Sequence, residues 1–244
     1  MTTLKRLSVL LMVFITAVGM VMGQANNGAN REMSVEESYL QESVEMMIIR
    51  EQSRTDSRDQ KLVALEYISD AINRGNTGEE IRTTLEYLAL EGTVNRAQEN
   101  GRLVNNYPDV RTKATTYLGD LGTPEAKNTL IRIVLADPEP MVLTEAVKSL
   151  GKIGINDNDE TVSAIAKIVN HFDSLKPDNL LALSAVEAFE KFAATGSIKD
   201  PNIIQVLNKI SYGNYIAPVK ERAKQVVANI RKSAIQPAQN GSNK

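Results

Sequence analysis

Apolar residues recur along most of the chain at intervals of three and four positions, the spacing that places them on one side of an α-helix. Short stretches rich in glycine, proline or polar residues separate these segments and are typical of turns. The pattern predicts a helix over 34–52, followed by first and second helices in alternation. We expect first helices over 60–73, 108–121, 140–153, 179–193 and 218–231, and second helices over 79–90, 124–135, 159–170 and 201–211.

The segment over 108–122 recurs, with most of its pattern intact, at 140–154. The positions that return 32 residues later are Pro108, Val110, Thr112, Ala114, Leu118, Gly119 and Gly122. The other first helices carry alanine in the same register, at Ala64, Ala185 and Ala223. A fixed period of this size indicates a stacked repeat array. The fold class is therefore all-α, a solenoid of about four helix pairs plus terminal helices.

The doubled segment resembles the HEAT repeat in its short bacterial form. The residues that carry the resemblance are Asp109-Val110-Arg111-Thr112-Lys113-Ala114, Leu118-Gly119-Asp120-Leu121-Gly122 and Glu125-Ala126. The unit at 140–154 matches too, with Met141 and Leu143 in place of the Asp and Arg. The resemblance implies a right-handed α-solenoid (an α-α superhelix) over about 58–232. It also implies that first helices form the convex side, that second helices line the concave side, and that Asp109 and Arg111 bridge neighbouring units.

The first 23 residues have the composition of an export signal. Lys5 and Arg6 precede an apolar run over 7–22, and the stretch ends at the small residue Gly23. This order is typical of a signal peptide that is cleaved, here after Gly23 or near Ala25. The alternative is an inner-membrane anchor formed by 7–22, although the run falls short of the roughly 20 residues that span a bilayer. A cleaved, cysteine-free chain is expected in a bacterial periplasm.

Three further segments lie outside the repeats. Residues 24–33 are rich in Asn and Gly and predict a flexible lead-in, and 233–244 are polar and predict a disordered tail. Residues 92–107 predict a short helix or an ordered insert, interrupted by Gly101.

The helix over 34–52 begins with a capping box, Ser34 to Glu37. It has two apolar faces on nearly opposite sides. One face carries Leu40, Val44, Met47 and Ile48; the other carries Val35, Tyr39, Met46 and Ile49. The helix either covers an open end of the array or offers a surface to a partner or a second copy. In the second case we expect Val35, Tyr39, Met46 and Ile49 to carry self-association.

Composition narrows the function classes. Aromatic residues make up 5% of the chain and Trp and Cys are absent, which favours closely packed helices and excludes disulfides and cysteine-ligated zinc. The net charge is −2, and it becomes about −4 without Lys5 and Arg6, so a nucleic-acid binder is not expected.

The sequence contains no pattern that is typical of a catalytic or metal-binding site. The single histidine, His171, cannot form the repeated His-Glu iron sites of HEAT-like hydroxylases, and nothing indicates the bilin of HEAT-like lyases. Residues 156–160 begin like a calcium loop, but the required glycine and final glutamate are missing. We expect this loop to cap the helix that follows. The sequence predicts no enzyme, catalytic residue, metal or cofactor, and a HEAT-like enzyme or lyase remains the third hypothesis.

Alignment of the second helices by their buried residues places two rows on the opposite face. One row contains Tyr87, Arg132, Lys167 and Lys209; the other contains Thr83, Asn128, Ser163 and Gln205. A basic row beside amides and hydroxyls suits an acidic peptide segment, although solvated helix faces have the same composition. The leading hypothesis is a periplasmic adaptor that binds an unidentified envelope protein through the concave face. The alternative is an assembly protein that forms homo-oligomers through its amino-terminal helix.

Overall fold

The computed structural model describes residues 34–196, 198, 200 and 202–235. The predicted signal, the lead-in and residues 236–244 of the predicted tail lie outside this range. The helices are α2 (Val35–Arg54), α3 (Arg58–Asn73), α4 (Glu79–Leu90), α5 (Pro108–Leu121), α6 (Pro124–Ala136), α7 (Pro140–Ile153), α8 (Glu160–Leu175), α9 (Asn179–Ala194), α10 (Asn202–Tyr212) and α11 (Ala217–Ile235), with a 3₁₀ turn at Asp157–Asp159 and strands β1 (Gln98–Glu99) and β2 (Arg102–Leu103). The all-α fold class is confirmed.

Contacts divide the chain into two units, Met1–Ser43 and Val44–Lys244. The boundary falls inside α2, so the second half of this helix belongs to the repeat unit. The described part of the first unit starts with the predicted capping box. There the Glu37 backbone N–H donates to Ser34 Oγ at 3.2 Å, and the Ser34 backbone N–H donates to Glu37 Oε2 at 3.0 Å.

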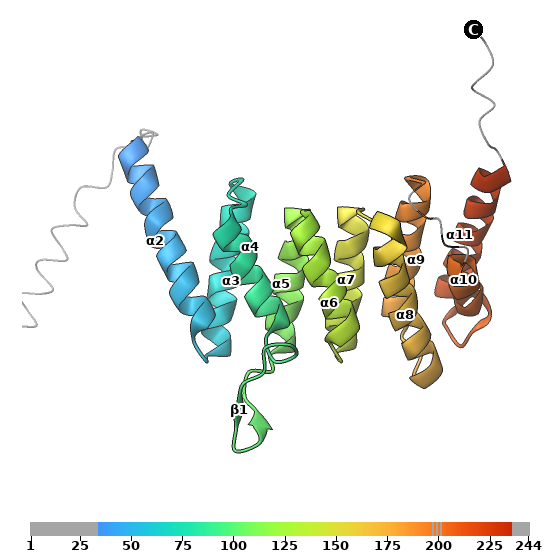
Figure 1. The fold of residues 1–244 in the computed structure, drawn as a ribbon, viewed down its shortest axis with the longest axis horizontal. Helices are drawn as coiled ribbons and strands as arrows, with labels where there is room; N and C mark the ends of the chain where they lie inside the picture. Colours follow the sequence, from blue (N-terminus) through green and yellow to red (C-terminus); the bar gives the residue numbers. More distant parts are fainter. Residues whose placement is uncertain (1–33, 197, 199, 201, 236–244) are drawn as a thin grey trace, which may run out of the picture. The chain divides into compact units, whose positions relative to one another are not determined.

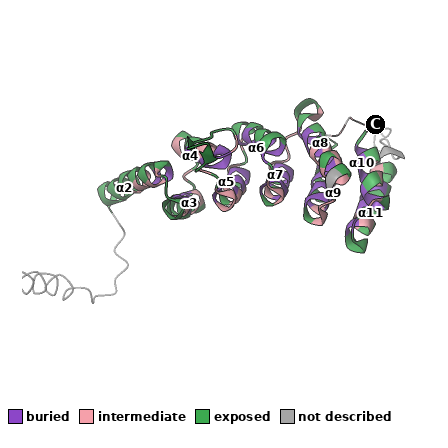
Figure 2. Ribbon diagram, turned by 90° about the horizontal axis from the view of Figure 1, so that it is seen from below, coloured by how far each residue is buried: buried purple, intermediate pink, exposed green. Residues whose placement is uncertain are grey.

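Within the second unit the helices from α3 onward form an α-solenoid of two rows (Figures 1 and 2). The first helices α3, α5, α7, α9 and α11 form the first-helix row, and the second helices α4, α6, α8 and α10 form the second-helix row. Successive first helices pack more closely than successive second helices do. The repeat therefore has a tight row and a looser row, and clefts are expected in the looser one.

The core lies between the rows and follows the predicted register. The repeat alanines Ala64, Ala114, Ala146, Ala185 and Ala223 are all fully buried. One turn further on, Leu118, Leu150 and Phe189 are also fully buried. Small residues let neighbouring helices approach, and larger ones fill the layer between units, so the repeat pattern is a packing pattern.

Helix ends explain the proline and glycine spacing. Pro108, Pro124 and Pro140 occupy the first turns of their helices, where the missing N–H costs nothing. Gly122 and Gly154 end α5 and α7 with φ of 68° and 72°. Side chains other than glycine resist this left-handed conformation, which is why the predicted ends of these helices are correct.

The insert over 92–107 contains a β-hairpin, so of the two predicted alternatives the ordered insert is correct and the short helix is wrong. Strands β1 and β2 pair antiparallel, with Gln98 opposite Leu103 and Glu99 opposite Arg102. Asn100 and Gly101 form the turn with φ of 50° and 77°. An Asn-Gly pair with both φ positive is the typical two-residue hairpin turn. The hairpin projects from one edge of the array, near the start of α5 (Figure 1).

Helix α8 ends at Leu175, five residues beyond its predicted end at 170. Its start matches the expected capping role of the preceding loop, because Asn156 Oδ1 accepts from the Val162 backbone N–H at 3.1 Å. Asp157 and Glu160 also lie within 3.5 Å and 3.2 Å of the nearly buried Lys127 ammonium on α6. The acidic loop thus ties two units together.

Arg111 and Asp109 do bridge neighbouring elements. Arg111 is fully buried and donates from Nε to Asp137 Oδ2 at 2.6 Å and from Nη2 to Oδ1 at 3.3 Å. Asp109 pairs with Arg58 of α3 at 2.5 Å. At the Arg111 position of the preceding unit, Lys61 is buried and pairs with Glu91 at 2.8 Å. Buried cation–carboxylate pairs therefore recur, and each joins a first helix to the residue that follows its own second helix.

Candidate functional site

The predicted rows on the second helices are exposed over α6, α8 and α10. The exposed residues are Asn128, Arg132, Ser163, Lys167, Gln205 and Lys209. Lys209 donates to Asn170 Oδ1 on α8 at 2.9 Å, which links the last two helices of the row. Within the described residues Arg132 and Lys167 have no ion-pair or hydrogen-bond partner. These two cations are therefore available to a ligand.

Tyr87, by contrast, does not share this open surface. It is half-buried against the core, and the Arg54 guanidinium at the end of α2 lies 4.2 Å from the centre of its ring. Burial, followed by the charge of Glu91, raises its pKa. Tyr87 belongs to the packing between α2 and α4, so the accessible basic row starts at Arg132.

The proposed self-association face of α2 is partly occupied within the chain. Ile49 is fully buried and Met46 packs against the core, so neither can carry self-association as predicted. Val35 and Tyr39 of the same face are exposed. The opposite face carries Leu40, Val44 and Met47 with at least half of each side chain exposed. The half of α2 from Val44 onward docks through Ile49, because that face meets the core.

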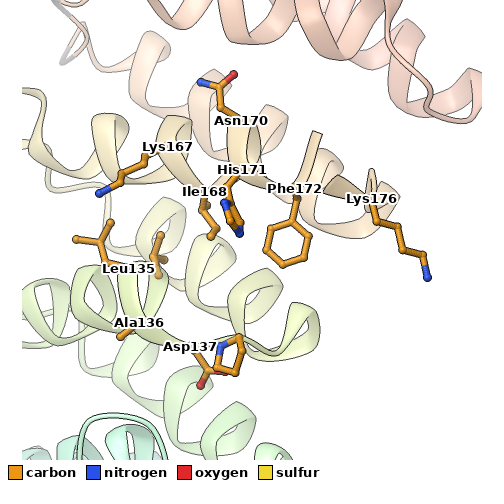
Figure 3. A pocket seen from close by; sticks show the side chains of 11 residues that line it. Leu135, Ala136, Asp137, Lys167, Ile168, Asn170, His171, Phe172 and Lys176 are labelled. Carbon is orange, nitrogen blue, oxygen red and sulfur yellow. The ribbon is translucent and has the colours of Figure 1, made fainter. Parts of the chain in front are cut away.

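A cleft of about 740 Å³ lies between the carboxyl-terminal ends of α6 and α8. Apolar walls come from both helices, with Val134, Leu135 and Pro138 on one side and Ile168 and Phe172 on the other. Figure 3 shows Ile168, His171 and Phe172 pointing toward Leu135–Asp137, while Asn170 points away. The spacing of 168, 171 and 172 puts them on the face of α8 that looks at α6.

The exposed ionisable residues that line the cleft are all basic. Asp137 lines it, but its carboxylate is fully buried against Arg111 and carries no free charge toward the opening. The remaining ionisable residues of the lining are Lys167, His171 and Lys176. All three are exposed. The cleft therefore combines apolar walls with a basic rim, which is formed by Lys167, His171 and Lys176.

Residues 102–188 match the family model for HEAT repeats. The matched segment consists of HEAT repeats. The matched range runs from β2 to within α9 and contains both helices that form the cleft. No curated protein matches the sequence. HEAT-repeat proteins are commonly scaffolds for protein interaction and are generally not catalysts.

The residues predicted from the sequence include Lys167 but not most of the cleft. Phe172 and Lys176 lie beyond the predicted end of α8, and Leu135 is only the predicted last residue of α6. A signal was present, because Ile165, Ile168 and Phe172 continue the helical spacing past Asn170. His171, expected near a helix end, lies in the last turns of α8 and faces the cleft.

Over the ranges that the structure describes, no three His, Asp or Glu side chains come together to hold a metal ion. None of the helices in the described ranges combines the length and apolar character that a membrane span requires.

Proposed function

We propose that this protein is a non-catalytic adaptor of the bacterial periplasm that binds an envelope protein through its second-helix row. The observation that supports the proposal is the exposed pair Arg132 and Lys167, which lie on successive second helices without partners of their own among the described residues. Charges that the fold does not use are available for an acidic partner.

Charge reversal on this surface tests the proposal. The protein is immobilised, incubated with detergent extract of its native envelope, and the retained proteins are quantified by mass spectrometry. We expect Arg132→Glu combined with Lys209→Glu to remove specific partners. The matched control is Lys113→Glu with Lys191→Glu, which reverses two exposed lysines on first helices α5 and α9. Equal capture by both variants would show that the second-helix row is not the binding surface.

Export has its own test. Residues 1–33 are fused to an alkaline phosphatase that lacks its signal and is active only outside the cytoplasm. We expect activity from the fusion, and we expect the amino terminus of the exported native protein to start at or soon after Gln24. A membrane-bound protein that retains Met1 would favour the anchor formed by 7–22.

A second candidate function is assembly through α2. The observation that favours it is the exposed stripe of Leu40, Val44 and Met47, with exposed fractions of 63%, 50% and 55%. An apolar stripe along a helix commonly packs against another helix. In this role a second copy would cover the stripe, and the adaptor surface would then be presented more than once per assembly.

A further inference from the structure

The cleft between α6 and α8 has the chemistry of a site for a particular kind of peptide, and this inference rests on the proposed adaptor function. Its volume of about 740 Å³ falls in the range of ligand sites in proteins. It could therefore take in a large side chain together with its backbone. Leu135, on the wall that α6 contributes, is 52% exposed although it lies beside the buried Val134. Apolar surface left open at a cleft favours an apolar occupant.

The distribution of charge indicates what surrounds that apolar group. Lys167 and Lys176 lie at opposite ends of the row formed by Ile168, His171 and Phe172 (Figure 3). The only carboxylate of the lining, Asp137, is already paired with Arg111. A ligand in the cleft therefore meets positive charge on both sides of an apolar centre, and no free negative charge.

The repeat register explains why this end of α8 is basic. Asp137 stands three residues before α7, and Lys176 stands three residues before α9. An aspartate is needed at position 137 because its carboxylate pairs with the buried Arg111. In the next unit Leu143 replaces the arginine and is fully buried, so no carboxylate is required. The lysine at this position has no such packing role, and it is exposed.

We propose that the α6–α8 cleft binds one large apolar side chain of an extended acidic segment, with carboxylates on either side of it meeting Lys167 and Lys176. The partner is thus a protein whose binding segment has a phenylalanine or leucine between aspartates or glutamates. Peptide recognition by an apolar anchor with flanking charges uses the apolar group for affinity and the charges for selection.

Fluorescence anisotropy with a defined probe tests this directly. The probe is a labelled peptide with a central phenylalanine and two Asp or Glu residues on each side. Two control peptides replace the phenylalanine by serine, or the acidic residues by Asn and Gln. We expect the serine peptide to bind about tenfold more weakly, because it lacks the apolar anchor. We expect the amide peptide to bind about fivefold more weakly and to lose its salt dependence.

Protein variants locate the binding. Ala136→Trp fills the cleft from the exposed last residue of α6, and Ala194→Trp places the same side chain at the exposed end of α9. Lys167→Glu with Lys176→Glu reverses the rim, and Lys113→Glu with Lys191→Glu is its control. We expect about a tenfold loss of affinity for the first member of each pair and none for the second. All substituted positions are exposed, and circular dichroism confirms that each variant is folded.

The outcomes separate this inference from the proposed function. Equal binding of the three peptides, or equal effects of Ala136→Trp and Ala194→Trp, would overturn the cleft assignment. If Arg132→Glu with Lys209→Glu still abolished capture from the envelope, the adaptor function would stand without it. Tighter binding of a single-stranded oligonucleotide than of the acidic probe, lost on rim reversal, would also overturn the assignment to a peptide.

Discussion

At the scale of single residues, buried charges hold the first and second helices of a unit together. Arg111 reaches Asp137 with two hydrogen bonds, and its Nη1 donates to Asn106 Oδ1 at 2.7 Å and to the Glu91 carbonyl at 3.4 Å. This guanidinium therefore joins the end of α4, the loop before α5 and the loop after α6. The next unit shows that an apolar residue can serve instead, because Leu143 occupies the equivalent position.

Removal of one member of this pair should be costly. We expect Arg111→Leu to lower the free energy of unfolding by about 3–5 kcal/mol, since Asp137 is left buried and unpaired. Arg111→Leu with Asp137→Asn should recover part of the loss, because no charge then remains in the core. Urea unfolding followed by circular dichroism measures both. Arg58→Ala, which breaks the exposed pair with Asp109, is the control and should cost much less. A smaller loss for Arg111→Leu than for Arg58→Ala would contradict this account.

Ionisation of Tyr215 should lower the stability of the fold at alkaline pH. Burial and the hydrogen bond from its hydroxyl to Asp173 Oδ1, 3.0 Å long, raise its pKa. The folded state therefore holds the phenol proton more tightly than the unfolded chain, whose tyrosines ionise near pH 10. Stability should be unaffected by this group below about pH 10 and should fall as the pH rises further. Tyr215→Phe should make this fall shallower and remove a late phase from the phenolate absorbance titration. An unchanged titration would show that another tyrosine ionises last.

At the scale of elements, the predictions succeed where one residue determines the conformation. Gly122 and Gly154 need a left-handed backbone and end their helices where predicted, and prolines start α5, α6 and α7. The hairpin was missed although Asn100-Gly101 is a strong turn signal, because its strands are too short and too exposed to show alternation. The cleft was missed because it depends on how far apart two helices lie. Spacing within one helix does not contain that information.

The close approach of the first helices can be tested by replacing two glycines, Gly119 and Gly151, with alanine. A Cβ on Gly119 of α5 would lie 2.7 Å from Ser149 Cβ and 2.5 Å from its Oγ, on α7. A Cβ on Gly151 of α7 would lie 3.0 Å from Ala188 Cβ on α9. Alanine in a helix normally stabilises by about 1 kcal/mol relative to glycine, but overpacking costs about 1–3 kcal/mol. We expect Gly119→Ala to destabilise by about 1–2 kcal/mol and Gly151→Ala to be nearly neutral, by urea unfolding. The reverse order would mean that α5 and α7 are not in such close contact.

At the scale of the whole molecule, the structure separates scaffold from surface. The residues that define the HEAT repeat are buried, and those that the repeat leaves free, Arg132 and Lys167 among them, are exposed on the second helices. The scaffold could be predicted from sequence because the same packing problem recurs in every unit. The binding surface could be predicted only as a row, since its cleft arises where the looser row opens between two particular units.

The α2 stripe makes a prediction about assembly. Deletion of residues 34–52 is a poor test, because Ile49 belongs to the core and its loss would damage the fold. Leu40→Glu with Met47→Glu instead places charges on the exposed stripe and leaves the core intact. If assembly occurs through α2, light scattering of the chain from residue 24 onward should show a dimer, and this variant should be a monomer. Val63→Glu with Tyr67→Glu, which alters exposed apolar residues of α3, is the matched control and should remain dimeric. A monomer for the unaltered chain at all concentrations would exclude the assembly role, and the adaptor would then act as a single copy.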